Sequence, residues 1–474
     1  PVQSRTHQQP FLSGGDGDSE LEGISGFDLR LDRDSGSCAG SGSVVGTPTE
    51  IAHSIRYGFS YPRRQAVNMP HRDLIVIGGG PAGAAAAIRA ARLGINVTVF
   101  EKGAFGRDKV CGDGLTPRAV GALLELGLNL DRSHRIRGLR MIAGNKVREL
   151  DWPETSRFPS YGAVWPRRQL DTALMEAAAD AGAETIYNTE VLPELDHQGR
   201  CIGVTTPEGT WTADLVVLAA GAQGKAARIL GAERDPDEPF GLAIRTYAET
   251  PRHKDAHIEA CLTLKDEEDV AVPGYGWLFP AGDGTVNIGC GALSTMKGFK
   301  SLNLNKLCDS YRDQMRDSWD LGPYLERPRA WRLPMSAQKR HGAGWVAIGD
   351  AAGLVNPMNG EGIDYGHETG MLIADLFESN PADATDEYDR LVGERFDGFL
   401  RTGRRFSFLI GHQRILRTGL RLAVGTEAIA RITLQVMGNL IDSDTPGAAG
   451  RVMTAADKFL AAADPVLRRT RATN

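Results

Sequence analysis

Residues 73–101 read DLIVIGGGPAGAAAAIRAARLGINVTVFE and predict a strand, a glycine turn, a helix and a second strand, in that order. Gly78, Gly80 and Gly83 occupy the turn, where the absence of side chains lets the backbone turn tightly and lets a phosphate approach the helix N-terminus. Glu101 ends the second strand, where a carboxylate can accept hydrogen bonds from a ribose. The stretch therefore predicts a Rossmann-like α/β unit that binds a dinucleotide.

A second motif indicates which dinucleotide. Residues 345–350 read WVAIGD, an apolar strand that ends at Asp350, and the sequence NPMNGEGID follows at 356–364. An acid at the carboxyl end of a strand lies at the sheet edge where cofactors bind. Asp350 can accept hydrogen bonds from a sugar-like chain, and Gly360 and Gly362 would open the next helix toward the cofactor. FAD needs a far-end contact for its ribityl chain and NAD does not, so the two motifs together predict FAD.

Composition and charge exclude several classes of function. The 474 residues are 41% hydrophobic and 24% charged, with a net charge of −6, and no basic tract is interleaved with aromatic residues, so nucleic acid is not expected as a partner. The six cysteines are scattered, without a C-x-x-C pair or a histidine cluster, and no metal site is predicted. The longest uncharged run, 74–88, is too short to span a bilayer and is interrupted by glycine and proline.

Residues 1–70 are rich in Gly, Ser, Asp and Arg and lack an apolar period, which predicts a disordered extension. Met69 lies just before the first strand. We therefore expect Met69 to be the natural start and residues 1–68 to lie outside the native protein.

The sequence between 236 and 334 changes to shorter alternating segments and predicts an antiparallel sheet. In Thr285–Ala292 the side chains of Val286, Ile288 and Cys290 fall on one face and glycines on the other, which allows close approach of a ligand or a second backbone. Tyr275, Trp277 and Phe279 alternate along another strand and share a face.

These motifs carry a resemblance to a known family. The fingerprint paired with the distal Gly-Asp resembles the FAD proteins that include the aromatic hydroxylases. YGWLFP at 275–280, followed by Gly289-Cys290-Gly291, resembles the signature of the geranylgeranyl reductases. KVCGDGLTPRAV at 109–120, FPSYG at 158–162 and NPMNGEGIDYGHETG at 356–370 are similar to the menaquinone-reducing branch of that family. The similarity extends over about residues 70–445.

The resemblance implies a fold and a set of site residues. The fold would be an FAD-binding Rossmann-like domain of the aromatic-hydroxylase type, an antiparallel β-sheet substrate domain and a C-terminal helical region. Its segments would be 71–235 and 335–385 for FAD, 236–334 for substrate and 386–474 for the helical, membrane-associating region. Carried over by position, the cofactor contacts would be Gly78, Gly80, Pro81, Ala82, Gly83, Glu101, Cys111, Gly112, Asp113, Gly114, Arg167, Val191, Asp350, Gly362 and Ile363.

The implied activity is an FAD-dependent oxidoreductase that acts on CH–CH groups and saturates an isoprene double bond, with the β-isoprene unit of menaquinone as the first candidate substrate. Cys111, Tyr275 and Trp277 would be the catalytic residues. Cys111 would either donate a proton, since a thiol with an ordinary pKa is protonated at neutral pH, or pack as a small hydrophobic residue. Tyr275 and Trp277 would line an apolar groove for the chain or serve as ordinary core aromatics.

Three alternative functions remain open at this point: a geranylgeranyl diphosphate or polyprenyl-lipid reductase, a flavin monooxygenase, and a flavin-binding scaffold without catalysis. Ala220-Gly221 stands where hydroxylases of this superfamily carry Asp-Gly, which lowers the monooxygenase alternative. The electron donor is not indicated by any motif.

The stretch 390–431 carries nine arginines against three acids. Phe396, Phe399 and Leu400 fall on one helical face, and Arg401, Arg404 and Arg405 fall on another. A basic amphipathic helix suits an anionic membrane surface, and a helix that covers the FAD domain is the alternative. The sequence therefore predicts a peripheral protein on the cytoplasmic face of the cell membrane.

Overall fold

Two large β-sheets, a short third sheet and the helices around them form the described part of the chain. The structure is a computed structural model that describes residues 69–222, 224–411, 415, 419, 422, 424–441 and 448–472. The predicted extension at 1–68 lies outside the described residues, as do Arg414, Arg417 and Arg421 of the basic stretch.

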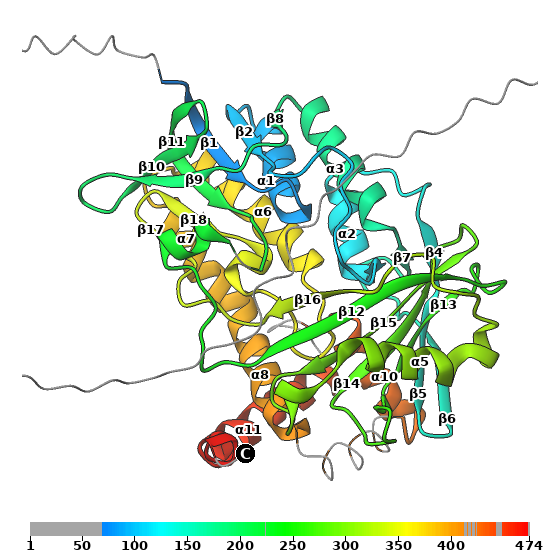
Figure 1. Cartoon of the computed structure of the whole chain (residues 1–474). Helices are drawn as coiled ribbons and strands as arrows, with labels where there is room; N and C mark the ends of the chain where they lie inside the picture. Colours follow the sequence, from blue (N-terminus) through cyan, green and yellow to red (C-terminus); the bar gives the residue numbers. More distant parts are fainter. Residues whose placement is uncertain are drawn as a thin grey trace, which may run out of the picture. The chain divides into compact units, whose positions relative to one another are not determined.

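The first sheet is built on the predicted strand–helix–strand unit (Figure 1). Strand β1 pairs in parallel with β2 on one side and with β11 on the other, and β18 and β8 extend the parallel sheet outward. Strands β2 and β18 are buried along their whole length, as is typical of a parallel sheet that is covered on both faces. The strands are β1 (His71–Ile77), β2 (Val97–Phe100), β8 (Glu184–Ile186), β9 (Leu192–Leu195), β10 (Cys201–Thr206), β11 (Gly209–Leu218), β17 (His341–Gly342) and β18 (Trp345–Ala347).

The helices on this sheet pack unusually closely. Helix α1 is rich in alanine, and its residues from Gly83 to Ile88 are all buried between the sheet and α6. A Cβ at Gly370 of α6 would lie 2.6 Å from the carbonyl oxygen of Ala82, so only glycine permits this approach. The helices around the sheet are α1 (Pro81–Arg92), α2 (Pro117–Glu125), α3 (Arg167–Asp180), α4 (Lys225–Leu230), the 3-10 turn η2 (Gly349–Ala352), α6 (Ile363–Ser379) and α7 (Ala384–Val392).

The second sheet has seven strands in the order β16-β12-β15-β14-β13-β5-β6. All neighbours are antiparallel except β13 and β5. The strands are β5 (Gly138–Ala143), β6 (Lys146–Asp151), β12 (Phe240–Glu249), β13 (His257–Cys261), β14 (Gly274–Pro280), β15 (Thr285–Leu293) and β16 (Arg329–Pro334). Five of them come from the predicted substrate segment, and β5 and β6 come from the segment assigned to FAD binding, so this sheet is discontinuous in sequence too.

The two faces of the second sheet differ in what they contact. Helix α5 (Leu304–Trp319), preceded by a 3-10 turn η1 (Phe299–Ser301), covers one face and buries Tyr311 and Trp319 there (Figure 1). Val286, Ile288 and Cys290 of β15 point into this cluster, which confirms the predicted alternation. The other face carries Trp277 and Asn287 toward the loops of the first sheet. The third sheet is small and consists of β3 (Gly114–Leu115), β7 (Gly162–Val164) and β4 (His134–Ile136), in that order.

The C-terminal region is helical, as the sequence predicts. It contains a π-helical turn η3 (Gly393–Asp397), α8 (Gly398–Ile410), α10 (Glu427–Met437) and α11 (Ala448–Ala472). None of the described helices combines the length and the apolar character that crossing a membrane requires.

The predicted basic amphipathic helix has a different environment from the one expected. Phe396 and Leu400 are buried in the core of the first sheet's domain, so its apolar face is covered by protein. Arg404 pairs with Glu238 and donates to the carbonyl of Met335, and Arg405 pairs with Asp457 of α11. Of the three arginines on the predicted basic face, Arg401 is exposed, and Arg404 and Arg405 are half-buried. The alternative, a helix that covers the FAD domain, describes this segment better.

Candidate active site

The glycine turn leaves open space at the N-terminus of α1. Gly78 has a φ of +108°, and a Cβ there would lie 2.6 Å from the carbonyl oxygen of Ala219. A Cβ at Gly83 would lie 1.9 Å from the carbonyl oxygen of Gly78. Gly80 is different, because the nearest atoms to its Cβ position are guanidinium nitrogens of Arg107 and Arg167, at 3.9 and 4.0 Å. The turn is thus closed on the protein side and open toward two cations, with Pro81 and Ala82 beginning the helix beside it.

The cations around this space are held in place by buried acids. Arg167 forms an ion pair with Asp171 one turn along α3 at 2.6 Å, and Arg107 contacts the same carboxylate at 3.1 Å. Burial and the charge of Arg167 lower the pKa of Lys109 to about 7. A diphosphate group fits this space, since backbone N–H groups, a helix dipole and guanidinium groups all favour negative charge there.

Glu101 lies at the end of β2, where the sequence predicts a ribose contact. Its carboxylate accepts hydrogen bonds from the N–H of Gly79 at 2.9 Å and of Gly103 at 2.8 Å, and Arg107 donates to it at 2.9 Å. Burial alone would raise the pKa of Glu101, but the bond and charge of Arg107 and the two N–H donors outweigh it and lower the pKa. Val191 is buried. It lies two residues after Thr189 in the sequence, and the N–H of Thr189 donates to the carbonyl of Glu101.

The distal motif contributes a second acid to the site. Asp350 lies in η2 directly after β18, and a Cβ at Gly362 would lie 2.7 Å from its carboxylate oxygen. Burial raises the pKa of Asp350, and Lys109 and Arg167 act in the other direction, so these cations lie within electrostatic range of it. Ile363 is the first residue of α6, as the glycines before it predict.

The loop of Cys111, Gly112, Asp113 and Gly114 contacts the second sheet directly. The amide of Asn287 on β15 donates to the carbonyl of Cys111 at 2.9 Å and to the carboxylate of Asp113 at 2.8 Å. Tyr247 of β12 donates to the same carboxylate at 2.5 Å, and the backbone N–H of Arg167 reaches its other oxygen at 3.1 Å. Asp113 is fully buried with a φ of +64°, so its carboxylate ties the loop to its surroundings.

The thiol of Cys111 lies next to Arg167. Burial raises the pKa of Cys111, and the charge of Arg167 opposes that shift without overcoming it. The thiol therefore stays protonated at neutral pH, which fits a proton donor and a packing element equally well.

The aromatic row of β14 lies against this loop. A Cβ at Gly112 would lie 3.3 Å from both the Phe279 ring and Nε1 of Trp277. Tyr275 and Trp277 have ring centroids 5.9 Å apart, and Trp277 and Phe279 have centroids 6.2 Å apart. The shared face predicted from alternation is confirmed. Its two polar groups are both hydrogen-bonded: the Tyr275 hydroxyl donates to the carbonyl of Asn359 at 2.5 Å, and the indole N–H of Trp277 donates to Asn287 at 2.9 Å.

Sequence reasoning missed Asn287, Tyr247 and Glu361. Asn287 is a single amide in an otherwise apolar and glycine-rich strand, which is the signal that could have identified it. Tyr247 carried no such signal, because its role depends on the pairing of β12 with β15. Glu361 lies inside the quoted motif NPMNGEGID, yet only its glycines were interpreted.

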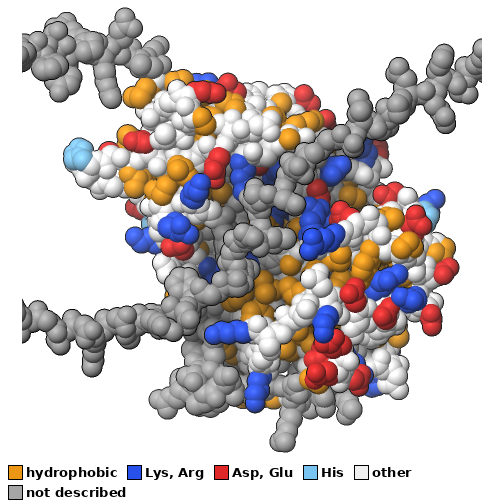
Figure 2. Space-filling view, in the orientation of Figure 1, with side chains coloured by type: hydrophobic (Ala, Val, Ile, Leu, Met, Phe, Trp, Pro, Cys, Tyr) orange, Lys and Arg blue, Asp and Glu red, His pale blue; other side chains and the backbone are white. Residues whose placement is uncertain are grey.

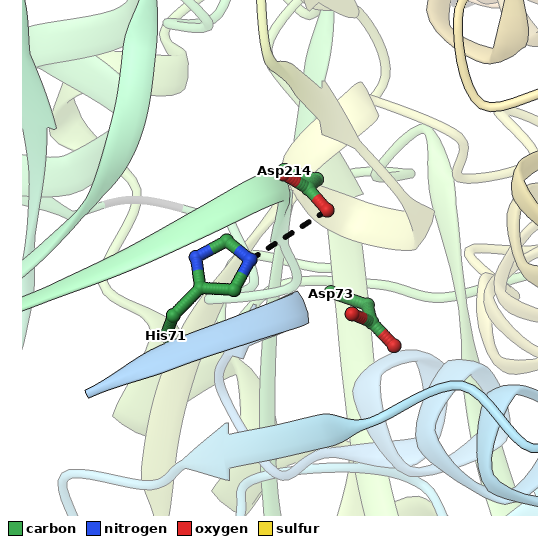
Figure 3. Close-up of side chains that lie close together, drawn as sticks. All are labelled: His71, Asp73 and Asp214. Carbon is green, nitrogen blue, oxygen red and sulfur yellow. Dashed lines mark ion pairs between the residues drawn. The ribbon is translucent and has the colours of Figure 1, made fainter.

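The described residues also bring together His71, Asp73 and Asp214 on β1 and β11 (Figure 3). His71 and Asp214 lie 3.7 Å apart, and both side chains are more than half exposed. His71 begins β1, whereas the glycine turn follows the other end of that strand, so this cluster is separate from the candidate active site.

FAD fits the residues that are present. The open space beside Gly80, the cations facing it, the acid at the end of β2 and the acid before Gly362 match the diphosphate, ribose and ribityl parts of the cofactor. The aromatic row and the loop of Cys111 would then face its reactive end.

Comparisons with known proteins agree with this geometry. A family model described as an FAD binding domain matches residues 71–374. A menaquinone reductase of Mycobacterium tuberculosis is 40% identical over 381 residues, covering 78% of this chain and 92% of the relative. A chloroplastic geranylgeranyl diphosphate reductase of Oryza sativa is 29% identical over 65% of this chain and 67% of its own length.

Solved structures show the same fold. A geranylgeranyl bacteriochlorophyll reductase-like protein of Thermoplasma acidophilum has a TM-score of 0.67 at 21% identity, covering 82% of this chain and all of its own. A flavin-dependent brominase has a TM-score of 0.66 at 16% identity, covering 82% of this chain and 98% of its own. From the family match and the 40% identical relative, this chain belongs to the FAD binding domain family, among the flavoproteins of the geranylgeranyl reductase group, and is an FAD-dependent oxidoreductase.

Proposed function

We propose that this protein saturates one isoprene double bond in the polyprenyl chain of menaquinone, at the β-isoprene unit. The observation that carries the proposal is the contact between the loop of Cys111–Gly114 and the aromatic row of Tyr275, Trp277 and Phe279. It supplies an apolar wall where the reactive end of the cofactor would lie. The relative with 40% identity is named for menaquinone reduction, which supports the choice of chain.

The chemistry needs a hydride, a proton and a dry site. Bound FAD, once reduced, supplies the hydride. The protein's part is to orient the alkene, to exclude water and to provide the proton. Cys111, Tyr275 and Trp277 are the proposed catalytic residues because the cysteine loop and the aromatic row lie against each other. The Cys111 thiol is either the proton donor or a wall of the site, and the aromatic rings hold the chain by apolar contact.

A second candidate substrate is a geranylgeranyl diphosphate or another polyprenyl lipid, which the names of the plant relatives favour. A free diphosphate would need a dedicated cationic pocket on the second sheet. There the guanidinium of Arg245 is bound to Asp108 and Glu326, and Arg329 also pairs with Asp108. These two cations already have acidic partners, so menaquinone remains the first candidate.

We also propose that the protein associates with the cytoplasmic face of the membrane, since a quinone with a polyprenyl tail resides in the bilayer. The support now comes from different side chains than the sequence suggested. Large apolar side chains are exposed on α8, α10 and α11, namely Phe406, Ile429, Val452 and Phe459. On the face viewed in Figure 2, hydrophobic and basic side chains lie side by side, and apolar groups next to cations suit an anionic lipid surface.

The function is tested with the holoenzyme under anaerobic conditions. Dithionite-reduced protein is mixed with menaquinone in detergent or vesicles, and the quinone is analysed by mass spectrometry for a gain of two hydrogens in the tail. Geranylgeranyl diphosphate is the parallel substrate. Reduction of the diphosphate alone would favour the second candidate. In a parallel reaction with oxygen admitted, hydroxylation without any alkene reduction would favour a monooxygenase.

A further inference from the structure

Glu361 places a carboxyl group with one unused oxygen beside the candidate active site. It lies in the segment Asn359-Gly360-Glu361-Gly362 directly before α6. One carboxyl oxygen accepts hydrogen bonds from the hydroxyl of Thr116 at 2.9 Å and from the N–H of Thr116 at 3.4 Å. The other oxygen, Oε2, is buried and has no hydrogen-bond partner among the described residues. A buried polar atom without a protein partner is explained by a catalytic role, by a bound water or ion, or by strain, and its place beside the aromatic row favours the first for Glu361.

Two neighbouring carboxyl groups have different surroundings. Asp364 accepts from the amide of Asn439 and from the N–H of Tyr365, and Arg118 acts on it electrostatically. Glu361 has no ion pair among the described contacts, and Thr116 is its hydrogen-bond donor. Burial, with the charge of Asp364 added, raises the pKa of Glu361 well above its ordinary value, while Thr116 and Arg118 only partly oppose the shift. Burial also raises the pKa of Asp364, to about 6, but Asp364 has Asn439 and Arg118 to stabilise its ionised form, so Glu361 is the acid of the pair that holds its proton more strongly.

The same segment contacts the aromatic row. The carbonyl of Asn359 accepts from the hydroxyl of Tyr275 at 2.5 Å, and the side-chain oxygen of Asn359 accepts from the N–H of Glu361 at 2.8 Å. Burial raises the pKa of Tyr275, and the charges of Glu361 and Cys111 raise it further. The carboxyl group and the Cys111 thiol are therefore both within electrostatic range of the hydroxyl of Tyr275, which belongs to the aromatic row proposed as the substrate wall.

We propose that Glu361 is the acid that protonates the alkene, with Thr116 as the positioning residue that holds its carboxyl group. This rests on the proposed function. The π bond of the alkene breaks, and the O–H bond of Glu361 breaks to form a C–H bond at the less substituted carbon. The hydride forms the second C–H bond at the more substituted carbon, where positive charge is better tolerated. Glu361 is left as a carboxylate and regains its proton from solvent after product release. Cys111 then serves as a wall of the site.

The test compares single turnovers of dithionite-reduced holoenzyme with menaquinone. Glu361→Gln keeps the shape and removes the acid, Glu361→Asp keeps the acid, and Glu378→Gln changes an exposed glutamate at the other end of α6. We expect Glu361→Gln to keep FAD and to slow alkene reduction by about 100-fold or more, the usual share of a general acid. Glu361→Asp should retain a measurable rate, and Glu378→Gln should match the wild type.

The pH profile gives a readout that a structural role would not change. Alkene reduction by the wild type should be fastest below the pKa of Glu361 and should fall as the pH rises through it. This fall in rate with rising pH should be absent in Glu361→Gln. The groups that act on this titration are Asp364 on α6, Arg118 on α2 and Tyr275 on β14, all unchanged in the variant.

The outcomes separate the two proposals. If the wild type reduces menaquinone and Glu361→Gln reduces it equally fast, while Cys111→Ser does not, the assignment of Glu361 is overturned and the proposed function stands. If the wild type reduces no polyprenyl lipid, both the proposed function and the assignment of Glu361 are overturned. If Glu361→Gln does not load FAD, infrared spectroscopy of the wild-type holoenzyme decides. A protonated carboxyl band that shifts in Glu361→Asp supports the proposal, and absence of such a band overturns it.

Discussion

The side-chain amide of Asn287 donates a hydrogen bond to the backbone carbonyl of Cys111 at 2.9 Å, which joins strand β15 of the second sheet to the loop that follows the first βαβ unit. The same side chain accepts from the indole N–H of Trp277 at 2.9 Å and donates to Asp113. One residue thus fixes the aromatic row and the cysteine loop relative to each other. The second sheet supplies both the aromatic row and the position of the loop.

Asn287→Ala should therefore weaken the protein and its hold on FAD together. The indole of Trp277 and the carboxylate of Asp113 would each lose a buried partner, at a cost of about 1–3 kcal/mol per unsatisfied group. We expect a clear drop in the urea unfolding midpoint and a lower FAD content after purification. Asn129→Ala, at an exposed position, is the matched control. An Asn287→Ala protein with wild-type stability and FAD content would show that the loop is held by other contacts.

The Gly289-Cys290-Gly291 signature should tolerate a methyl group at one glycine and not at the other. A Cβ at Gly289 would lie 2.3 Å from the ring of Trp277 and 2.4 Å from the carbonyl oxygen of Ile244. At Gly291 the nearest atom would be the carbonyl oxygen of Leu242, at 3.3 Å. We expect Gly289→Ala to displace Trp277 and to reduce alkene reduction at least tenfold, and Gly291→Ala to stay within about twofold of the wild type. Tryptophan fluorescence and turnover measure both effects, and equal behaviour of the two variants would contradict this explanation.

The sequence was sufficient where the fold depends on local chemistry. Gly78 and Gly83 predict the turn because no other residue fits the backbone there, and Asp350 predicts the sheet edge because a short apolar strand precedes it. The alternation of Tyr275, Trp277 and Phe279 was readable because a strand has a period of two.

The features that the sequence did not reveal depend on pairing between distant segments. Strands β5 and β6 join the second sheet through a parallel contact between β5 and β13, which no local pattern encodes. Tyr247 reaches Asp113 only because β12 lies beside β15. The basic stretch after residue 390 shows the same limit, because amphipathic spacing could not tell whether Phe396 and Leu400 face lipid or protein.

Membrane association should depend on the exposed apolar side chains of the last helix rather than on the paired arginines. Val452→Ser with Phe459→Ser should reduce co-sedimentation with phosphatidylglycerol vesicles several-fold, because both side chains are exposed on α11. Leu325→Ser, in the loop before β16 and about as exposed as Val452, is the control and should sediment like the wild type. Equal loss in the control, or no loss in the double variant, would count against α11 as the docking element.

Replacing two glycines of the fingerprint with alanine should have different effects, one on FAD binding and the other on folding. Gly80 has a φ of −79°, which any residue adopts. The atom nearest to its Cβ position is a guanidinium nitrogen of Arg107, at 3.9 Å, so a methyl group would not clash with the protein. The methyl group would instead occupy the space between the turn and the guanidinium groups of Arg107 and Arg167. We expect Gly80→Ala to fold normally and to bind FAD at least tenfold more weakly, a loss of about 1.4 kcal/mol. Gly83→Ala should instead misfold, since its methyl group would overlap the backbone of Gly78. Circular dichroism and FAD titration separate the two failures, and a Gly80→Ala protein with wild-type affinity would mean that the diphosphate does not pass beside this turn.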